Sequence, residues 1–104
     1  MFSNRQLSIL HSLHQSRPRE RAAIVAGVDN DIIRALSEMS LNVLRGNIPL
    51  QHGQKKRLRK HKQTMRSLAN RLLSLDTKRR LVQQSGGFLP VLLPIIASVL
   101  SGGL

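Results

Sequence analysis

The chain has 104 residues, enough for one domain with a tail, and its 17 Lys and Arg against five Asp and Glu give a formal net charge of +12. It contains no cysteine, which excludes disulfides and cysteine-ligated zinc sites. The charge is uneven: residues 54–104 hold 11 basic and one acidic residue, a net of +10, whereas residues 1–53 hold six basic and four acidic, a net of +2. This asymmetry favours a local surface for a polyanion.

The N-terminal part of the sequence predicts two short helices. Ser3 followed by Gln6 is a capping-box pattern, which marks the start of the first helix. Pro18 ends that helix and is suited to the first turn of the next one. The second helix is expected over about residues 19–26, and Gly27 is placed to end it.

A third helix is predicted after Asp29 or Asn30, either of which can cap it. Gly46, followed shortly by Pro49, ends it. Its apolar residues recur every three or four positions, the period of a helix with one buried face. They are Ile32, Ile33, Leu36, Met39, Val43 and Leu44.

A fourth helix is predicted to begin between Gln51 and Gln54 and to run to about Leu73. We expect it to form an antiparallel hairpin with the third helix. A last short helix, residues 77–84, can be capped by Asp76. The narrow buried stripe of the fourth helix is expected to consist of Leu58, Met65, Leu68, Leu72 and Leu75.

Together these patterns predict an all-α fold, a small bundle of four to five short helices over about residues 3–84, followed by an apolar C-terminal helical tail. No segment has the two-residue alternation of a strand. The predicted domain organisation is a helical domain at 1–84 with a basic segment at 54–80, a Ser-Gly-Gly hinge at 85–87, and the apolar tail at 88–104.

The basic segment, 54–80, contains most of the positive charge. Residues three or four apart are neighbours on a helix, so Lys55, Arg59, Lys62 and Arg66 are expected to form one ridge. The alternative is an ordinary solvated helix face. The concentration of charge favours double-stranded DNA bound through its phosphates without sequence specificity, because the chain has no Trp or Tyr to stack on unpaired bases. The predicted nucleic-acid-binding residues are Lys55, Lys56, Arg57, Arg59, Lys60, Lys62, Arg66, Lys78, Arg79 and Arg80.

The tail after Gly86 and Gly87 is uncharged and almost wholly apolar. Its run of 88–100 is shorter than the ~20 residues of a spanning helix and contains Pro90 and Pro94. Three fates stay open for it: packing on its own domain or on another protein, insertion into or disruption of a membrane, and self-association. The residues expected to contact a membrane or partner are Phe88, Leu89, Val91, Leu92, Leu93, Ile95, Ile96, Val99 and Leu100.

The junction between the basic and apolar parts resembles a viral sequence. Gly86-Gly87-Phe88-Leu89-Pro90 and the residues up to 97, after a basic segment, resemble the C-terminal part of the adenovirus core protein X precursor, the precursor of mu. Residues 84–87 also resemble the recognition pattern of the adenovirus-type maturation protease, which implies cleavage between Gly87 and Phe88. The candidate cleavage-site residues are Gln84, Gly86, Gly87 and Phe88.

Residues 30–100 resemble a small basic protein of Polinton (Maverick) elements and adintoviruses, through segments 42–50, 54–62 and 66–69 as well as the tail. This resemblance implies a virion core or minor capsid protein of a double-stranded DNA virus or virus-like element, located in the virion and, during assembly, in the host nucleus. One feature departs from the adenovirus precursor, which is a low-complexity Arg/His-rich peptide. This chain has patterned helices, so its contact with DNA is expected to differ.

The sequence does not predict an enzyme, because it has no nucleophile–base motif, phosphate-binding Gly loop or acidic metal cluster. His11 and His14 have the spacing of a metal-binding pair but no evident third ligand, so no metal or cofactor is predicted. Three functions stay open. The first is a virion protein that binds double-stranded DNA, with capsid proteins and a maturation protease as further partners. The others are a membrane-active minor capsid protein and a structural adaptor whose tail docks on a capsid protein.

Overall fold

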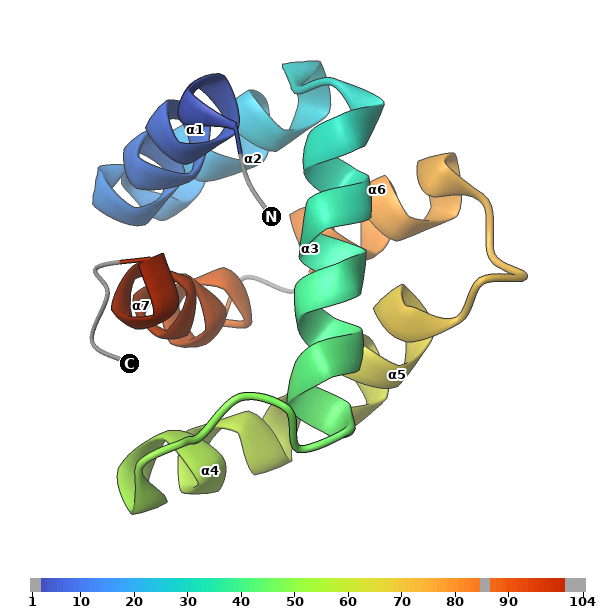
Figure 1. Ribbon diagram of the computed structural model, residues 1–104. Coiled ribbons are helices and arrows are strands. Elements are labelled where there is room, and N and C mark those ends of the chain that lie inside the picture. Colours follow the sequence, from blue (N-terminus) through green and yellow to red (C-terminus); the bar gives the residue numbers. More distant parts are fainter. Residues whose placement is uncertain (1–2, 85–86, 101–104) are drawn as a thin grey trace.

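The longest helix, α3, is the element around which the others are arranged in this computed structural model (Figure 1). The structure describes residues 3–84 and 87–100, except the side chains of Pro18, Val99 and Leu100. Within these ranges there is no strand, and the predicted all-α fold is confirmed. The elements are α1 (Asn4–Gln15), α2 (Pro18–Gly27), α3 (Asn30–Leu44), α4 (His52–Leu58), the 3₁₀ turn η1 (Arg59–His61), α5 (Lys62–Ala69), α6 (Leu75–Gln84) and α7 (Leu89–Leu100).

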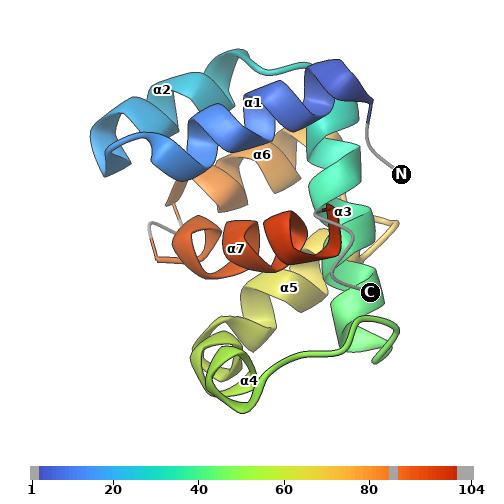
Figure 2. The same cartoon turned by 60° about the vertical axis from the view of Figure 1, so that its left-hand side comes forward.

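The helices form one packed unit with α7 in its middle. Helices α1 and α2 lie side by side at one end and α4 lies at the other, with α7 between them (Figures 1 and 2). Helices α5 and α6 pack on α3 and on each other, and α6 also packs on α2. The radius of gyration is 12.6 Å, close to the ~13 Å of a compact domain of 100 residues.

The predicted start of the first helix is confirmed in atomic detail. The Gln6 amide N–H donates to the Ser3 hydroxyl at 3.1 Å, and the Ser3 N–H donates to Gln6 Oε1 at 2.7 Å. Pro18 occupies the first turn of α2, as predicted. Gly27 is the last residue of α2 rather than the residue after its end.

The end of α3 is set by Gly46, which has a φ of +74°. The Gly46 N–H donates to the Val43 carbonyl at 3.1 Å, and the Asn47 N–H donates to the Asn42 carbonyl at 3.0 Å. This pair of bonds is the Schellman motif, which needs a residue with positive φ directly after the C-cap. The predicted helix end is therefore confirmed, and its cause is the left-handed glycine.

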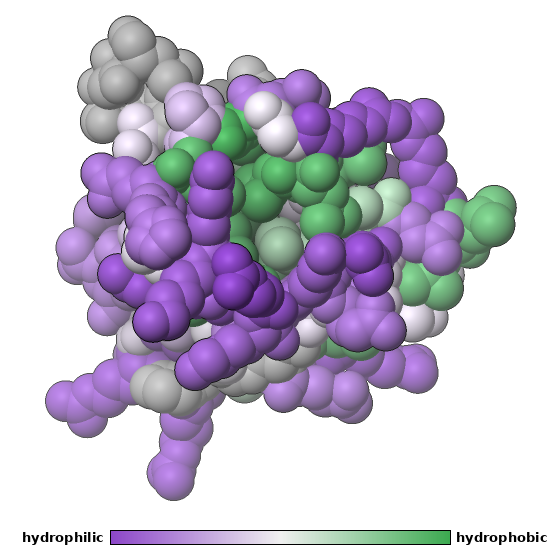
Figure 3. All heavy atoms as spheres, turned by 90° about the horizontal axis from the view of Figure 1, so that it is seen from below, coloured by the Kyte–Doolittle hydropathy of each residue, from purple (hydrophilic) through white to green (hydrophobic). Residues whose placement is uncertain are grey.

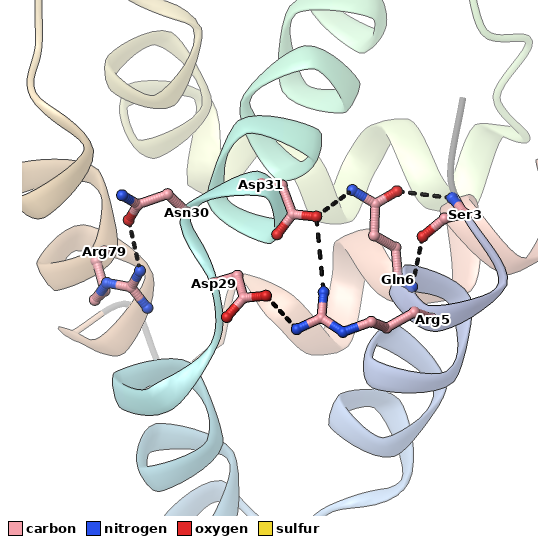
Figure 4. Close-up of polar contacts among 7 residues, drawn as sticks. All are labelled: Ser3, Arg5, Gln6, Asp29, Asn30, Asp31 and Arg79. Carbon is pink, nitrogen blue, oxygen red and sulfur yellow. Dashed lines mark hydrogen bonds and ion pairs between the residues drawn. The ribbon is translucent and has the colours of Figure 1, made fainter.

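The start of α3 is held by side chains of α1 rather than by a side-chain cap (Figure 4). Asp29 is the N-cap, but its carboxylate pairs with Arg5 instead of bonding to the helix backbone. Gln6 Nε2 donates to Asp31 Oδ2 at 3.1 Å. The prediction of a cap from the side chain of Asp29 or Asn30 was therefore wrong, because a cationic partner distant in sequence competes for the carboxylate.

The predicted fourth helix is broken into α4, η1 and α5, and α5 is the part that packs on α3. Leu58, Met65 and Leu68 are buried as predicted. The stripe is interrupted there, because α5 ends at Ala69 and Leu72 is 94% exposed in the following loop. Leu75, at the start of α6, is again partly buried against the core. Asn70 Oδ1 accepts a hydrogen bond from the Leu72 N–H at 2.9 Å, a local turn that replaces the helical bond.

The last basic helix, α6, begins two residues earlier than predicted. The Thr77 N–H donates to the Ser74 hydroxyl at 3.2 Å, and the Lys78 N–H donates to the Ser74 carbonyl at 3.1 Å. Asp76 lies inside the first turn, where its charge suits the helix dipole. The cap is therefore Ser74 and not Asp76.

The apolar tail is part of the core of the domain. Phe88 is fully buried, and Leu89, Leu92, Ile95 and Ile96 belong to the same apolar cluster as residues of α1, α3, α4 and α5. A helix that is apolar on every side is stable in water only when it is covered on most sides. Helices α1 and α4 provide that cover from two directions.

Replacing Gly46 by alanine is expected to lower the free energy of unfolding by about 1–2 kcal/mol, because an L-residue is strained at positive φ. No atom lies within 4 Å of the added Cβ, so the effect would be conformational only. Urea unfolding measures it. Gly27→Ala is the matched control, since its Cβ also meets nothing within 4 Å but φ is not positive. A Gly46→Ala protein as stable as Gly27→Ala would contradict this account.

Candidate nucleic-acid interface

The candidate interface is built on α4, a helix of seven residues that is too short to be stable alone. Gln51 and Gln54 form a capping box at its start, with the Gln51 N–H donating to Gln54 Oε1 at 3.0 Å. Leu58 near its end is 3% exposed and anchors it in the core. The three basic side chains of α4, Lys55, Lys56 and Arg57, face solvent.

Seven basic side chains of α4, η1 and α5 are exposed. Within the described residues, the ion pairs are those of Arg5 with Asp29 and Asp31, so none of the seven has an acidic partner. The result is a strongly positive surface at one end of the molecule. We name it the basic face, and it consists of Lys55, Lys56, Arg57, Arg59, Lys60, Lys62 and Arg66.

The predicted ridge is partly preserved across the break at η1. Lys55, Arg59 and Lys62 line one groove of about 240 Å³ between α4, α5 and the end of α3, whereas Arg66 does not line it. Figure 3 views the molecule from the α4 end and shows apolar side chains in a hollow surrounded by hydrophilic ones. The basic face thus borders an apolar surface, which the sequence analysis did not predict.

Lys78, Arg79 and Arg80, which were also predicted to bind nucleic acid, lie on α6 and are not part of the basic face. Lys78 is 6% exposed, and burial lowers the pKa of its ammonium, an effect that Glu38 opposes and Arg71 reinforces. Arg79 Nη1 donates to the Val25 carbonyl at 2.7 Å, and its Nη2 donates to Asn30 Oδ1 at 2.9 Å (Figure 4).

Arg79 therefore links α6 to α2 and to the start of α3, Lys78 is buried, and Arg80 is the exposed member of the three. Arg71, which was not among the predicted site residues, is exposed in the loop between α5 and α6. A count of basic residues would have included it. The inward direction of Lys78 and Arg79 has no signal in the local sequence.

The candidate cleavage site is closed on its C-terminal side. Phe88 is fully buried, and its ring lies 5.9 Å from the ring of His61, centre to centre. A Cβ at Gly87 would lie 3.3 Å from His61 Cε1, so glycine permits this close approach. Gln84 is exposed at the end of α6, and Gly86 lies outside the described residues.

Most side chains predicted to contact a membrane or partner are covered. Phe88, Leu89, Leu92, Leu93, Ile95 and Ile96 are buried, and Val91 is half-buried. The side chains of Val99 and Leu100 lie outside the described residues. No single helix in the described part of the chain is long and apolar enough to cross a membrane. Taken together, helices α6 and α7 have the length and composition of a membrane-spanning segment, with a bend of 106° between them.

Metal ligands do not gather in the described residues, where no group of three His, Cys, Asp or Glu side chains is placed to hold an ion. His11 and His14 instead border an apolar cavity between α1 and α7. No protein-family model matches the chain, nor does any curated protein or solved structure. The resemblance to proteins of adenoviruses and Polinton elements therefore stays a prediction.

Replacing Lys78 by methionine is expected to raise the free energy of unfolding near neutral pH, because the buried ammonium loses hydration and methionine does not. The folded-state pKa lies below the usual 10.5, so the unfolded chain binds more protons just beneath that pH. The stability of the natural protein should therefore rise as pH increases through this window, and Lys78→Met should lack that rise.

Urea unfolding at a series of pH values up to 10.5 tests this difference. Arg80→Met is the control, since the same charge is lost from an exposed position of the same helix. If Lys78→Met were less stable than the natural protein at neutral pH, the attraction to Glu38 would outweigh the desolvation of the ammonium.

Proposed function

We propose that the chain binds double-stranded DNA through its phosphates, without sequence specificity, as a virion core or minor capsid protein. The observation that carries this proposal is the basic face, seven exposed cations on three consecutive elements with no acidic partner among the described residues. Cations in this arrangement repel one another, and a row of phosphates relieves that repulsion.

The expected affinity is electrostatic and depends strongly on salt. If the seven residues of the basic face contact about six phosphates, the slope of log K against log salt is about −5. Lys78 is buried and Arg79 is hydrogen-bonded within the fold, so neither is counted among the phosphate contacts. Sequence reading is not proposed, because the face is formed by Lys and Arg without aromatic side chains to stack on bases.

The proposed location, in the virion and, during assembly, in the host nucleus, rests on the resemblance alone. The membrane-active and adaptor alternatives both require apolar side chains of α7 that are buried in the folded domain. Either function would need α7 to leave its place between α1 and α4. DNA binding needs no such change, which is why it is the function proposed.

Neutralising part of the basic face is expected to weaken duplex binding at least tenfold at about 0.1 M salt and to reduce the slope by about 2 to 3, because three phosphate contacts are lost. The measurement is a salt titration of binding to a fluorescent duplex. The variant, named the outer triple, is Lys56→Gln/Arg57→Gln/Lys60→Gln.

The matched control removes the same charge from the opposite end of the molecule. Its three exposed arginines lie on or next to α2 and in the first half of α3 (Figure 1). The distal triple is Arg17→Gln/Arg19→Gln/Arg34→Gln. Equal losses in the two triples would show that total charge, and not the basic face, determines binding, and the proposal would fail.

Cleavage after Gly87 by an adenovirus-type maturation protease is expected to be slow in the folded chain, because the buried Phe88 must first leave the core. Leu92→Ala should accelerate it, since truncating a buried leucine of α7 loosens that helix by about 2–5 kcal/mol without changing residues 84–88. Product formation over time measures the rate. Leu72→Ala, an exposed leucine, should have no effect, and rapid cleavage of the natural chain would contradict the expectation.

A further inference from the structure

The groove beside the basic face has an apolar floor that DNA phosphates would not use. Leu58 and Met65 lie at its bottom with 3% and 4% exposure, and Leu50 is half-buried on its wall. Leu44, at the end of α3, also lines it and is 36% exposed. Apolar side chains offer no hydrogen bond to a phosphate oxygen, so this part of the groove suits an apolar group of a partner better than a phosphate.

The rim of the groove has charge of one sign. Lys55, Arg59 and Lys62 are the charged residues that line it, and none has an acidic partner among the described residues. This separates the basic face into two sets. The three rim cations stand around an apolar floor, whereas the other four, Lys56, Arg57, Lys60 and Arg66, do not line the groove.

We propose that this groove docks an acidic amphipathic helix of a partner protein. Apolar side chains one turn apart would enter the groove, and Asp or Glu beside them would pair with Lys55, Arg59 and Lys62. The volume of about 240 Å³ is below the range usual for small-molecule and cofactor pockets, which suits a few inserted side chains better than a whole ligand.

Charge complementarity selects this occupant over the others. A second copy of the chain has a net charge of +12 and would bring more cations to a cationic rim. Leu72, the most exposed leucine among the described residues, follows Arg71, so insertion of that loop would be opposed by charge repulsion. DNA phosphates would pair with the rim cations but would leave Leu44 and the apolar floor without an apolar partner. The proposal does not rest on DNA binding.

The test uses the full chain and a fluorescein-labelled helical peptide with two leucines four residues apart, surrounded by glutamates. Fluorescence anisotropy measures its affinity. The rim triple should weaken binding at least tenfold, and the outer triple, which also removes two lysines and one arginine, by no more than about twofold. The rim triple is Lys55→Gln/Arg59→Gln/Lys62→Gln.

The apolar floor is tested by a second matched pair. Leu44→Ala should weaken peptide binding about fivefold, because part of a buried apolar contact is lost, while Leu72→Ala should leave it unchanged. A peptide with alanine in place of its leucines should bind at least tenfold more weakly. In the natural protein, the peptide should shift the NMR signals of the Met65 and Leu44 methyl groups and not those of Val25, a readout that depends on no variant.

Three results would overturn the proposal. Equal losses in the rim and outer triples would mean that the peptide follows total charge, and equal binding of the alanine peptide would mean that the floor is unused. Self-association of the peptide-free protein that Leu44→Ala abolishes would assign the groove to a second copy. The outer triple is expected to bind DNA more weakly but to bind the peptide almost as well as the natural protein. Failure of the DNA proposal and failure of the groove proposal would therefore appear in separate measurements.

Discussion

The structure depends on the cover that it gives to α7, a helix with no charged residue and apolar side chains on every face. Helix α1 covers it from one direction and α4 from another, so two parts of the chain about 40 residues apart are brought to the same helix. Phe88, directly before this helix, is buried in the core with its ring next to the His61 ring of η1. The apolar part of the chain is thus what closes the fold around the basic part, although the two are separate in the sequence.

Sequence patterns were sufficient where structure is decided locally. The capping box of Ser3 and Gln6 and the helix end at Gly46 each depend on residues within about one turn, and both are as predicted. The break at η1 was not predictable in this way, because apolar spacing alone fits a continuous helix across residues 58–68. Leu72 continued that spacing and is nevertheless exposed, since the Asn70 side chain ends the helical bonding before it.

The candidate site could be predicted only in composition. Local sequence placed seven cations on α4, η1 and α5, and all seven are exposed. The same reasoning treated Lys78 and Arg79 alike, but their environment is set by Glu38, Val25 and Asn30, about 40 to 54 residues away in the chain. The apolar groove is likewise formed by α3, α4 and α5 together. Features of this kind depend on tertiary packing, which periodicity does not specify.

Helix α4 links the charge of the protein to its core. Seven residues with three consecutive cations would not stay helical in isolation, and the repulsion among them works against the fold. The burial of Leu58 offsets that repulsion by anchoring the helix to the core, and the same leucine lines the groove. A ligand that supplies negative charge to the basic face therefore stabilises the helix that presents it. One that also fills the groove stabilises the contact between that helix and α3, so charge and apolar surface act on the same short element.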